Sequence, residues 1–106
     1  MIVDVKQLQD LCQSVLTRGG VGEEDAHIVT DILVEAELRG RPAHGVIRLP
    51  AIVERCKSSG RKPMRLARDG GAYALIDGQE NLGYLVAHRC TRTAVDKAQA
   101  RGVGVI

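Results

Sequence analysis

His44 and Arg48 are the residues of this 106-residue chain whose types and spacing could do chemistry. They lie in the segment Arg-Pro-Ala-His-Gly-Val-Ile-Arg-Leu-Pro, bracketed by Pro42 and Pro50 and too short for a full helix. An imidazole donates or accepts a proton near neutral pH, and a guanidinium holds a carboxylate through two parallel hydrogen bonds. If the segment turns helically, both side chains emerge on one face. The pair would then supply the minimum set of groups for redox chemistry on a 2-oxo or 2-hydroxy acid. The alternative interpretation is that the two residues form no site and are a histidine at a helix start and a surface arginine.

The other histidines and the paired charges are predicted to be structural. His27 lies on the charged side of a predicted helix and His88 within a later one, where solvated or partly packed roles are favoured. Two glutamates each precede an arginine by four residues: Glu35 precedes Arg39, and Glu37 precedes Arg41. On a surface helix, such pairs are more often solvated ion pairs than acid/base catalysts.

The cysteines argue against a metal centre or a disulfide framework. Cys12, Cys56 and Cys90 are odd in number and widely spaced, and they form no CxxC pair and have no histidine at a zinc-finger interval. We expect them to act as small hydrophobic residues and expect no metal site.

Residues 1–60 are predicted to form a helical region with three helices. Asp4 followed three residues later by Gln7 is typical of a capping box, and apolar residues then keep helical spacing up to a glycine pair. A second helical stripe starts after Gly22 and stops before Gly40, with acidic residues at its positive end. A third stripe includes Ile52, Val53 and Cys56.

Residues 61–71 are predicted to be a basic loop. Four basic residues fall in the longer segment that connects Lys57 to Gly71, and they are Arg61, Lys62, Arg65 and Arg68. A basic cluster can follow phosphates, but without neighbouring aromatic residues or a recognition motif a solvated loop is favoured.

Residues 72–106 are predicted to start an α/β layer that is incomplete. A strand over 72–77 closes at an Asp-Gly turn, and Asn81 caps a helix with one apolar side. The wholly apolar run 103–106 then resembles the second, buried strand of a strand-helix-strand unit. The predicted fold class is therefore α/β, with truncation expected within this last strand.

Composition excludes several classes of protein. Leu, Ile and Val make up 29 of the 106 residues, which is enough for an ordered aliphatic core, and the net charge is only +2. Phe and Trp are absent, which argues against a base-stacking nucleic-acid platform. No apolar run is long enough to cross a membrane, and the N-terminus lacks the pattern of a signal peptide. We therefore expect a cytoplasmic protein without nucleic-acid or membrane partners.

Several segments together resemble the malate/L-lactate dehydrogenase family, which includes ureidoglycolate, sulfolactate and 2,3-diketogulonate oxidoreductases and lacks the usual Rossmann dinucleotide domain. The most specific is the pattern Arg-Gly-x-x-x-His-Gly-Val-x-Arg-Leu over residues 39–49. Supporting segments are residues 35–40, the Asp77-Gly78 turn, Gly83 and residues 98–106. The resemblance covers nearly the whole chain, but only the N-terminal part of the family.

The resemblance implies a role for each candidate residue. His44 would donate a proton to the substrate carbonyl and Arg48 would hold the substrate carboxylate, while NAD or NADP would carry the hydride. Family members work as dimers. The chain has Pro42-Ala43 where the family usually has Asp-Ser, so groups that could orient the imidazole are missing. Most of the cofactor site, with a second histidine in an Asn-x-x-His motif, is expected beyond Ile106.

The leading hypothesis is thus the N-terminal portion of an NAD(P)-dependent oxidoreductase that interconverts a 2-oxo acid and a 2-hydroxy acid. The alternative is a noncatalytic dimerisation module, or one that binds a polyanion through its basic loop. Alone, the 106-residue chain is expected to be inactive and to self-associate through the uncovered terminal strand and the predicted helix that precedes it.

Overall fold

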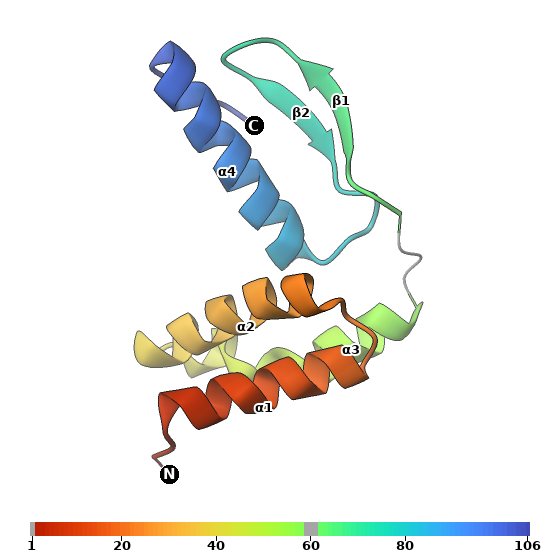
Figure 1. Ribbon diagram of the computed structural model, residues 1–106, viewed down its shortest axis with the longest axis vertical. Helices are drawn as coiled ribbons and strands as arrows, with labels where there is room; N and C mark the ends of the chain where they lie inside the picture. The colour runs from red at the N-terminus through yellow and green to blue at the C-terminus, as the bar shows by residue number, and fades with distance from the viewer. Residues whose placement is uncertain (1, 59–61) are drawn as a thin grey trace. The chain divides into compact units, whose positions relative to one another are not determined.

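The computed structural model describes residues 2–58 and 62–106 of the chain. Contacts divide it into two compact units, Met1–Ser59 and Gly60–Ile106, and each is described by itself (Figure 1).

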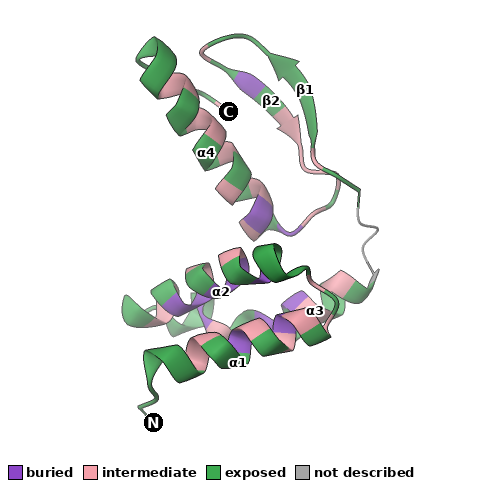
Figure 2. Ribbon diagram, in the orientation of Figure 1, coloured by how far each residue is buried: buried purple, intermediate pink, exposed green. Residues whose placement is uncertain are grey.

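The first unit consists of three helices, as predicted: α1 (Val5–Arg18), α2 (Glu23–Leu38) and α3 (Leu49–Ser58). The side chain of Asp4 caps α1, because its Oδ2 accepts a hydrogen bond of 3.1 Å from the Gln7 amide. The core is formed mainly by α1 and α2 (Figure 2). Its buried residues are Cys12, Leu16, Ala26, Val29, Thr30, Leu33, Val34, Leu49 and Ile52.

Two short 3-10 turns connect α2 to α3. After Gly40, which has a φ of +69°, the chain forms η1 (Pro42–His44) and η2 (Val46–Arg48). Pro42 starts η1, where its fixed φ suits the first position and its missing N–H is not needed. The proline-bracketed segment is therefore not a continuous helix, and the two turns carry His44 and Arg48 at their last positions.

The second unit contains a hairpin and one helix. β1 (Arg65–Asp69) pairs antiparallel with β2 (Ala74–Asp77), with Arg65 opposite Asp77 and a register irregularity between Leu66 and Arg68. The prediction of a solvated basic loop is therefore wrong in its loop conformation over β1, although the segment is exposed. All of β1 is exposed, so it lacks the apolar alternation by which a half-buried strand is detected. Arg61, from the same predicted cluster, lies outside the described residues.

Helix α4 (Gly83–Arg101) follows the hairpin. The prediction that Asn81 caps it is wrong, because the N-cap is Leu82 and no side chain makes a capping bond there. Asn81 instead ties the preceding loop, where its Nδ2 donates to the carbonyl oxygens of Lys62 and Gly78, each at 2.7 Å.

The predicted strand over residues 103–106 is reduced to one parallel bridge between Tyr73 and Val105. The Ala74 amide donates to the Val105 carbonyl and the Val105 amide to the Ala72 carbonyl, both at 2.9 Å. The bridge is parallel, which is the direction expected of a chain that returns after a crossover helix, but among the described residues no second strand forms beyond it. Within the described part of the chain, no helix is both long enough and apolar enough to cross a membrane.

Candidate functional site

The C-terminal part of α2 supports the turn that carries His44. Glu37 Oε1 accepts a hydrogen bond of 3.0 Å from the Val46 amide, nine residues further along the chain. Gly45 is buried beside it, and a Cβ atom there would lie 2.2 Å from Glu37 Oε1. The Glu37 carboxylate thus occupies the space that a larger residue at position 45 would need.

The two predicted ion pairs on α2 have different outcomes. Glu35 pairs with Arg39 as expected, with Oε1 and Nε 2.6 Å apart. The predicted pair of Glu37 with Arg41 is wrong, since Glu37 binds the Val46 amide and no such pair is found among the described residues. Helical spacing favoured Arg41 as the partner of Glu37 and gave no indication of the Val46 amide, nine residues away.

His44 is an exposed residue at the end of η1. Its amide donates to the Arg41 carbonyl at 3.0 Å, and the Gly45 amide donates to the Pro42 carbonyl at 3.1 Å. These two backbone bonds close the turn on which the imidazole stands, while the ring itself stays accessible to a ligand.

Arg48 reaches back across the turn toward His44. Its Nε donates a hydrogen bond of 2.9 Å to the carbonyl of Ala43, the residue just before His44. A continuous helix would have set the two side chains on one face, but Gly45, with φ −97° and ψ −144°, interrupts the helical path. The bond to the Ala43 carbonyl therefore holds the guanidinium at the backbone just before His44. With Nε engaged, the edge formed by the two Nη groups is the one suited to a carboxylate.

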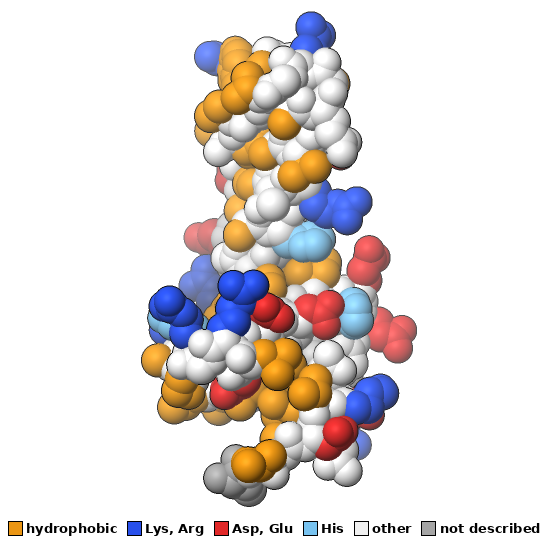
Figure 3. Space-filling view, turned by 90° about the vertical axis from the view of Figure 1, so that its left-hand side faces the viewer, with side chains coloured by type: hydrophobic (Ala, Val, Ile, Leu, Met, Phe, Trp, Pro, Cys, Tyr) orange, Lys and Arg blue, Asp and Glu red, His pale blue; other side chains and the backbone are white. Residues whose placement is uncertain are grey.

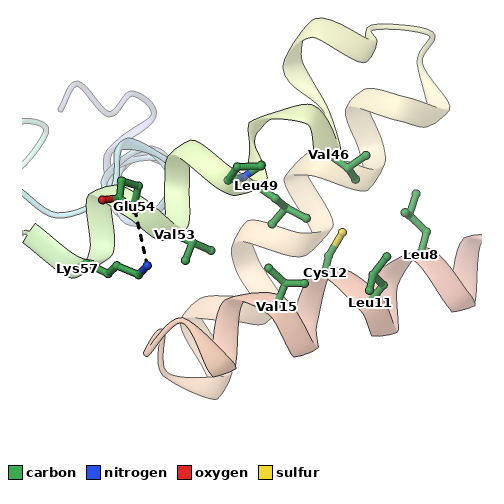
Figure 4. A pocket seen from close by; sticks show the side chains of 10 residues that line it. Leu8, Leu11, Cys12, Val15, Val46, Leu49, Val53, Glu54 and Lys57 are labelled. Atoms are coloured by element: carbon green, nitrogen blue, oxygen red, sulfur yellow. Dashed lines mark ion pairs between the residues drawn. The ribbon is translucent and has the colours of Figure 1, made fainter.

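Behind this segment lies an apolar groove between α1 and α3 with a volume of about 480 Å³ (Figure 4). It is lined by Leu8, Leu11, Cys12, Val15, Val46, Leu49, Pro50, Val53, Glu54 and Lys57. Neither His44 nor Arg48 belongs to this lining, so the groove is separate from the candidate site.

Cys12 is a fully buried residue of α1. Burial raises the pKa of the Cys12 thiol, and the negative charge of Glu37 raises it further. A raised pKa keeps the thiol neutral and poorly nucleophilic, which agrees with the prediction that Cys12 is a small core residue.

The remaining predicted candidates do not join this site. On the exposed surface of α2, His27 Nε2 lies 3.4 Å from Asp31 Oδ2. His88 is half-buried on α4. Residues 2–58 and 62–106 contain no group of three or more metal-ligating side chains. In the basic segment, Arg65 pairs with Asp77 at 3.2 Å. On the face in Figure 3, basic side chains over the helical unit lie beside acidic ones instead of forming a patch of one charge.

The fold and the site define an α/β protein that presents an imidazole and a guanidinium on one glycine-containing double turn. Residues 3–106 match the family described as malate/L-lactate dehydrogenase. The chain belongs to this family.

Two archaeal relatives illustrate the match. Malate dehydrogenase of Pyrococcus horikoshii is 47% identical over 95 residues, which are 87% of this chain and 26% of the relative. Its solved structure superimposes with a TM-score of 0.94 at 44% identity, covering 99% of this chain and 31% of that one. L-sulfolactate dehydrogenase of Methanocaldococcus jannaschii is 35% identical over 109 residues, which are 100% of this chain and 32% of the relative.

The structure of sulfolactate dehydrogenase from the same organism gives a TM-score of 0.90 at 36% identity, covering 99% of this chain and 32% of that one. The chain thus spans about a third or less of the length of these relatives. Both are named as dehydrogenases of hydroxy acids, which places the chain in a family of oxidoreductases.

Proposed function

We propose that the protein carrying these residues is an NAD(P)-dependent oxidoreductase that interconverts a 2-oxo acid and a 2-hydroxy acid. The bond from Arg48 Nε to the Ala43 carbonyl supports this proposal, because it holds the guanidinium at the backbone of the residue just before His44, whose side chain is exposed. The names of the relatives, malate and sulfolactate dehydrogenase, support a hydroxy acid as the substrate.

In the proposed mechanism Arg48 binds the substrate carboxylate through its Nη edge, which places the neighbouring C2 oxygen near the imidazole of His44. During oxidation of the hydroxy acid, His44 takes the proton of the C2 hydroxyl as the carbonyl forms. During reduction, protonated His44 gives that proton to the carbonyl oxygen. The chemistry that a nicotinamide cofactor would supply when bound is transfer of the hydride to or from C2, while His44 handles the proton on the C2 oxygen. We assign no residue of this chain to the cofactor, which is proposed to bind the part of the family fold that these residues do not cover.

The proposal extends to the partners and location of the protein. A small 2-oxo or 2-hydroxy acid is the proposed ligand, and a homodimer in the cytoplasm is the proposed working form. Exposed apolar residues of the second unit, among them Leu75 and Val105, support self-association.

The proposed function is tested by measuring turnover of the full polypeptide in which these residues occur. The enzyme would be incubated with NADH or NADPH and a panel of 2-oxo acids, and the absorbance of the reduced cofactor followed. We expect His44→Ala to lower turnover by about 10²- to 10⁴-fold, the range for a lost general acid, with a smaller change in substrate binding. His27→Ala, on the exposed face of α2, is the matched control and should retain wild-type turnover. Near-normal turnover of His44→Ala would remove the proposed proton donor.

A further inference from the structure

The Glu37 carboxylate is committed to the backbone of the neighbouring turn. It is half-buried, and its Oε1 accepts the Val46 amide at 3.0 Å. A carboxylate removed from water needs a partner of this kind, and a backbone amide is a fixed one. Glu37 therefore links the last part of α2 to the first residue of η2.

Gly45 makes room for this link. A Cβ atom at position 45 would lie 2.2 Å from Glu37 Oε1, 2.6 Å from its Cδ and 2.9 Å from its Cγ. All three distances are to the same side chain, so Glu37 is the first group that a larger residue at this position would meet.

Two contacts thus hold the turn on either side of His44. Val46 is bound by Glu37 at 3.0 Å, and Ala43 is bound by the Arg48 Nε at 2.9 Å. We infer that Glu37 is a positioning residue, which acts through the Val46 amide to hold His44 and Arg48 in their working arrangement. This inference rests on the proposed function, and Glu37 itself touches neither substrate nor cofactor.

The role requires a hydrogen-bond acceptor at position 37 and not a charge. The amide oxygen of glutamine can accept the same bond with the same side-chain length, whereas alanine cannot. Glu37→Gln should therefore rescue what Glu37→Ala loses, which separates the hydrogen bond from the electrostatic effect of the carboxylate.

The first test compares the kinetics of these variants in the full polypeptide. A misplacement of about 1 Å can lower a rate about 10²-fold, so we expect Glu37→Ala to lower kcat by about 10- to 100-fold with a smaller change in KM. Glu37→Gln should stay within a few-fold of wild type. Glu35→Ala is the matched control, because Glu35 lies on the same helix but only pairs with exposed Arg39, and it should keep wild-type kcat.

The second test is a double-mutant cycle between positions 37 and 45. Gly45→Ala alone should be impaired, because its methyl group meets the Glu37 carboxylate. In the Glu37→Ala background that space is empty, so Gly45→Ala should cost little more. The inference would be overturned if the effects of Glu37→Ala and Gly45→Ala on kcat multiplied in the double variant. It would also be overturned if Glu37→Gln were as impaired as Glu37→Ala.

Amide hydrogen exchange at Val46 separates this inference from the proposed function. Protection of that amide should be retained in Glu37→Gln and lost in Glu37→Ala, whether or not the protein turns over any substrate. Absence of turnover in the wild type with retained Val46 protection would contradict the proposed reaction alone. Unchanged protection in Glu37→Ala would contradict the role of Glu37, and thermal melting of both variants would show that each remains folded.

Discussion

The guanidinium of Arg48 divides its hydrogen bonds between the protein and the proposed substrate. Nε binds the Ala43 carbonyl, and the edge with the two Nη groups is suited to a carboxylate. Planarity links these two functions, because fixing Nε also fixes the plane in which the carboxylate must lie.

Replacement of Arg48 by lysine should separate the two functions. An ammonium is a point charge that cannot bind the Ala43 carbonyl and also offer two parallel bonds to a carboxylate. Loss of a charge-assisted hydrogen bond costs about 1.5–3 kcal/mol, so we expect KM for the 2-oxo acid to rise by about 10- to 100-fold. Steady-state kinetics of Arg48→Lys measures this, with Arg39→Lys, at the exposed pair with Glu35, as control. An unchanged KM in Arg48→Lys would exclude the carboxylate role.

For single residues, the sequence predicted the chemical groups of the candidate site but not the contacts that hold them. His44 and Arg48 could be selected by residue type and by the proline-bracketed segment. The role of Glu37 could not, since helical spacing indicated Arg41 as its partner and only the interrupted turn brings the Val46 amide to the carboxylate. The Arg48 bond to Ala43 depends on the same interruption at Gly45.

Among the elements, the hairpin of the second unit depends on the ionised side chain of Asp77. Its Oδ1 accepts the Gln79 amide at 3.0 Å, and its Oδ2 accepts from the Arg65 Nη2 at 3.2 Å. The bond from the Gln79 amide, together with Arg65, lowers the pKa of Asp77 below its ordinary value. The side chain of Lys97 likewise lowers the pKa of Asp69 at the other end of β1.

Acid should therefore weaken the hairpin. A carboxyl group whose pKa is lower in the folded state stabilises fully above its unfolded value of about 3.9, and this contribution is lost as pH falls through the folded value. Asp77→Asn should be less stable than wild type at pH 6, with the difference shrinking below about pH 4. Urea unfolding followed by circular dichroism across this range measures it. Asp96→Asn, at an exposed residue of α4, is the control, and a pH-independent difference for Asp77→Asn would contradict the prediction.

Elements were predictable where they bury an apolar side. The three helices of the first unit and α4 follow from helical spacing, and Ala74 on β2 is buried. β1 has no buried residue, so only its pairing with β2 reveals it. The stripe on α2 also includes Thr30, a polar residue that is 2% exposed and that a hydrophobic pattern passes over.

At the scale of the whole molecule, the chain carries the proposed proton donor and the proposed carboxylate anchor but spans about a third or less of its relatives. Catalysis requires the hydride donor and the proton donor to be held on the same substrate, and such positioning supplies several kcal/mol of the barrier reduction. We therefore expect the isolated 106-residue polypeptide to show no measurable oxidation of NADH or NADPH with any 2-oxo acid. Saturable activity that tracks the polypeptide and disappears in His44→Ala would show instead that these residues assemble a complete site.

The isolated polypeptide should also self-associate through the second unit. Leu75, Val103 and Val105 are 60%, 55% and 62% exposed, and apolar side chains of this size are rarely left together in water. Light scattering across a dilution series should show a concentration-dependent mass, and Leu75→Glu should reduce it. Leu38→Glu places the same charge at a residue of α2 that is 62% exposed, and it serves as the control. A constant monomer mass would contradict the expectation.

The contact between Glu37 and Gly45 also has a consequence for how the chain can change over evolution. Because the carboxylate fills the space beside the glycine, a larger residue at position 45 is tolerated only after position 37 has become small. Loss of the Glu37 side chain conversely removes the steric reason for glycine at 45, while leaving the Val46 amide without its acceptor. The two positions should therefore change together in descendants of this sequence, with alanine or serine at 45 accompanied by a short side chain at 37.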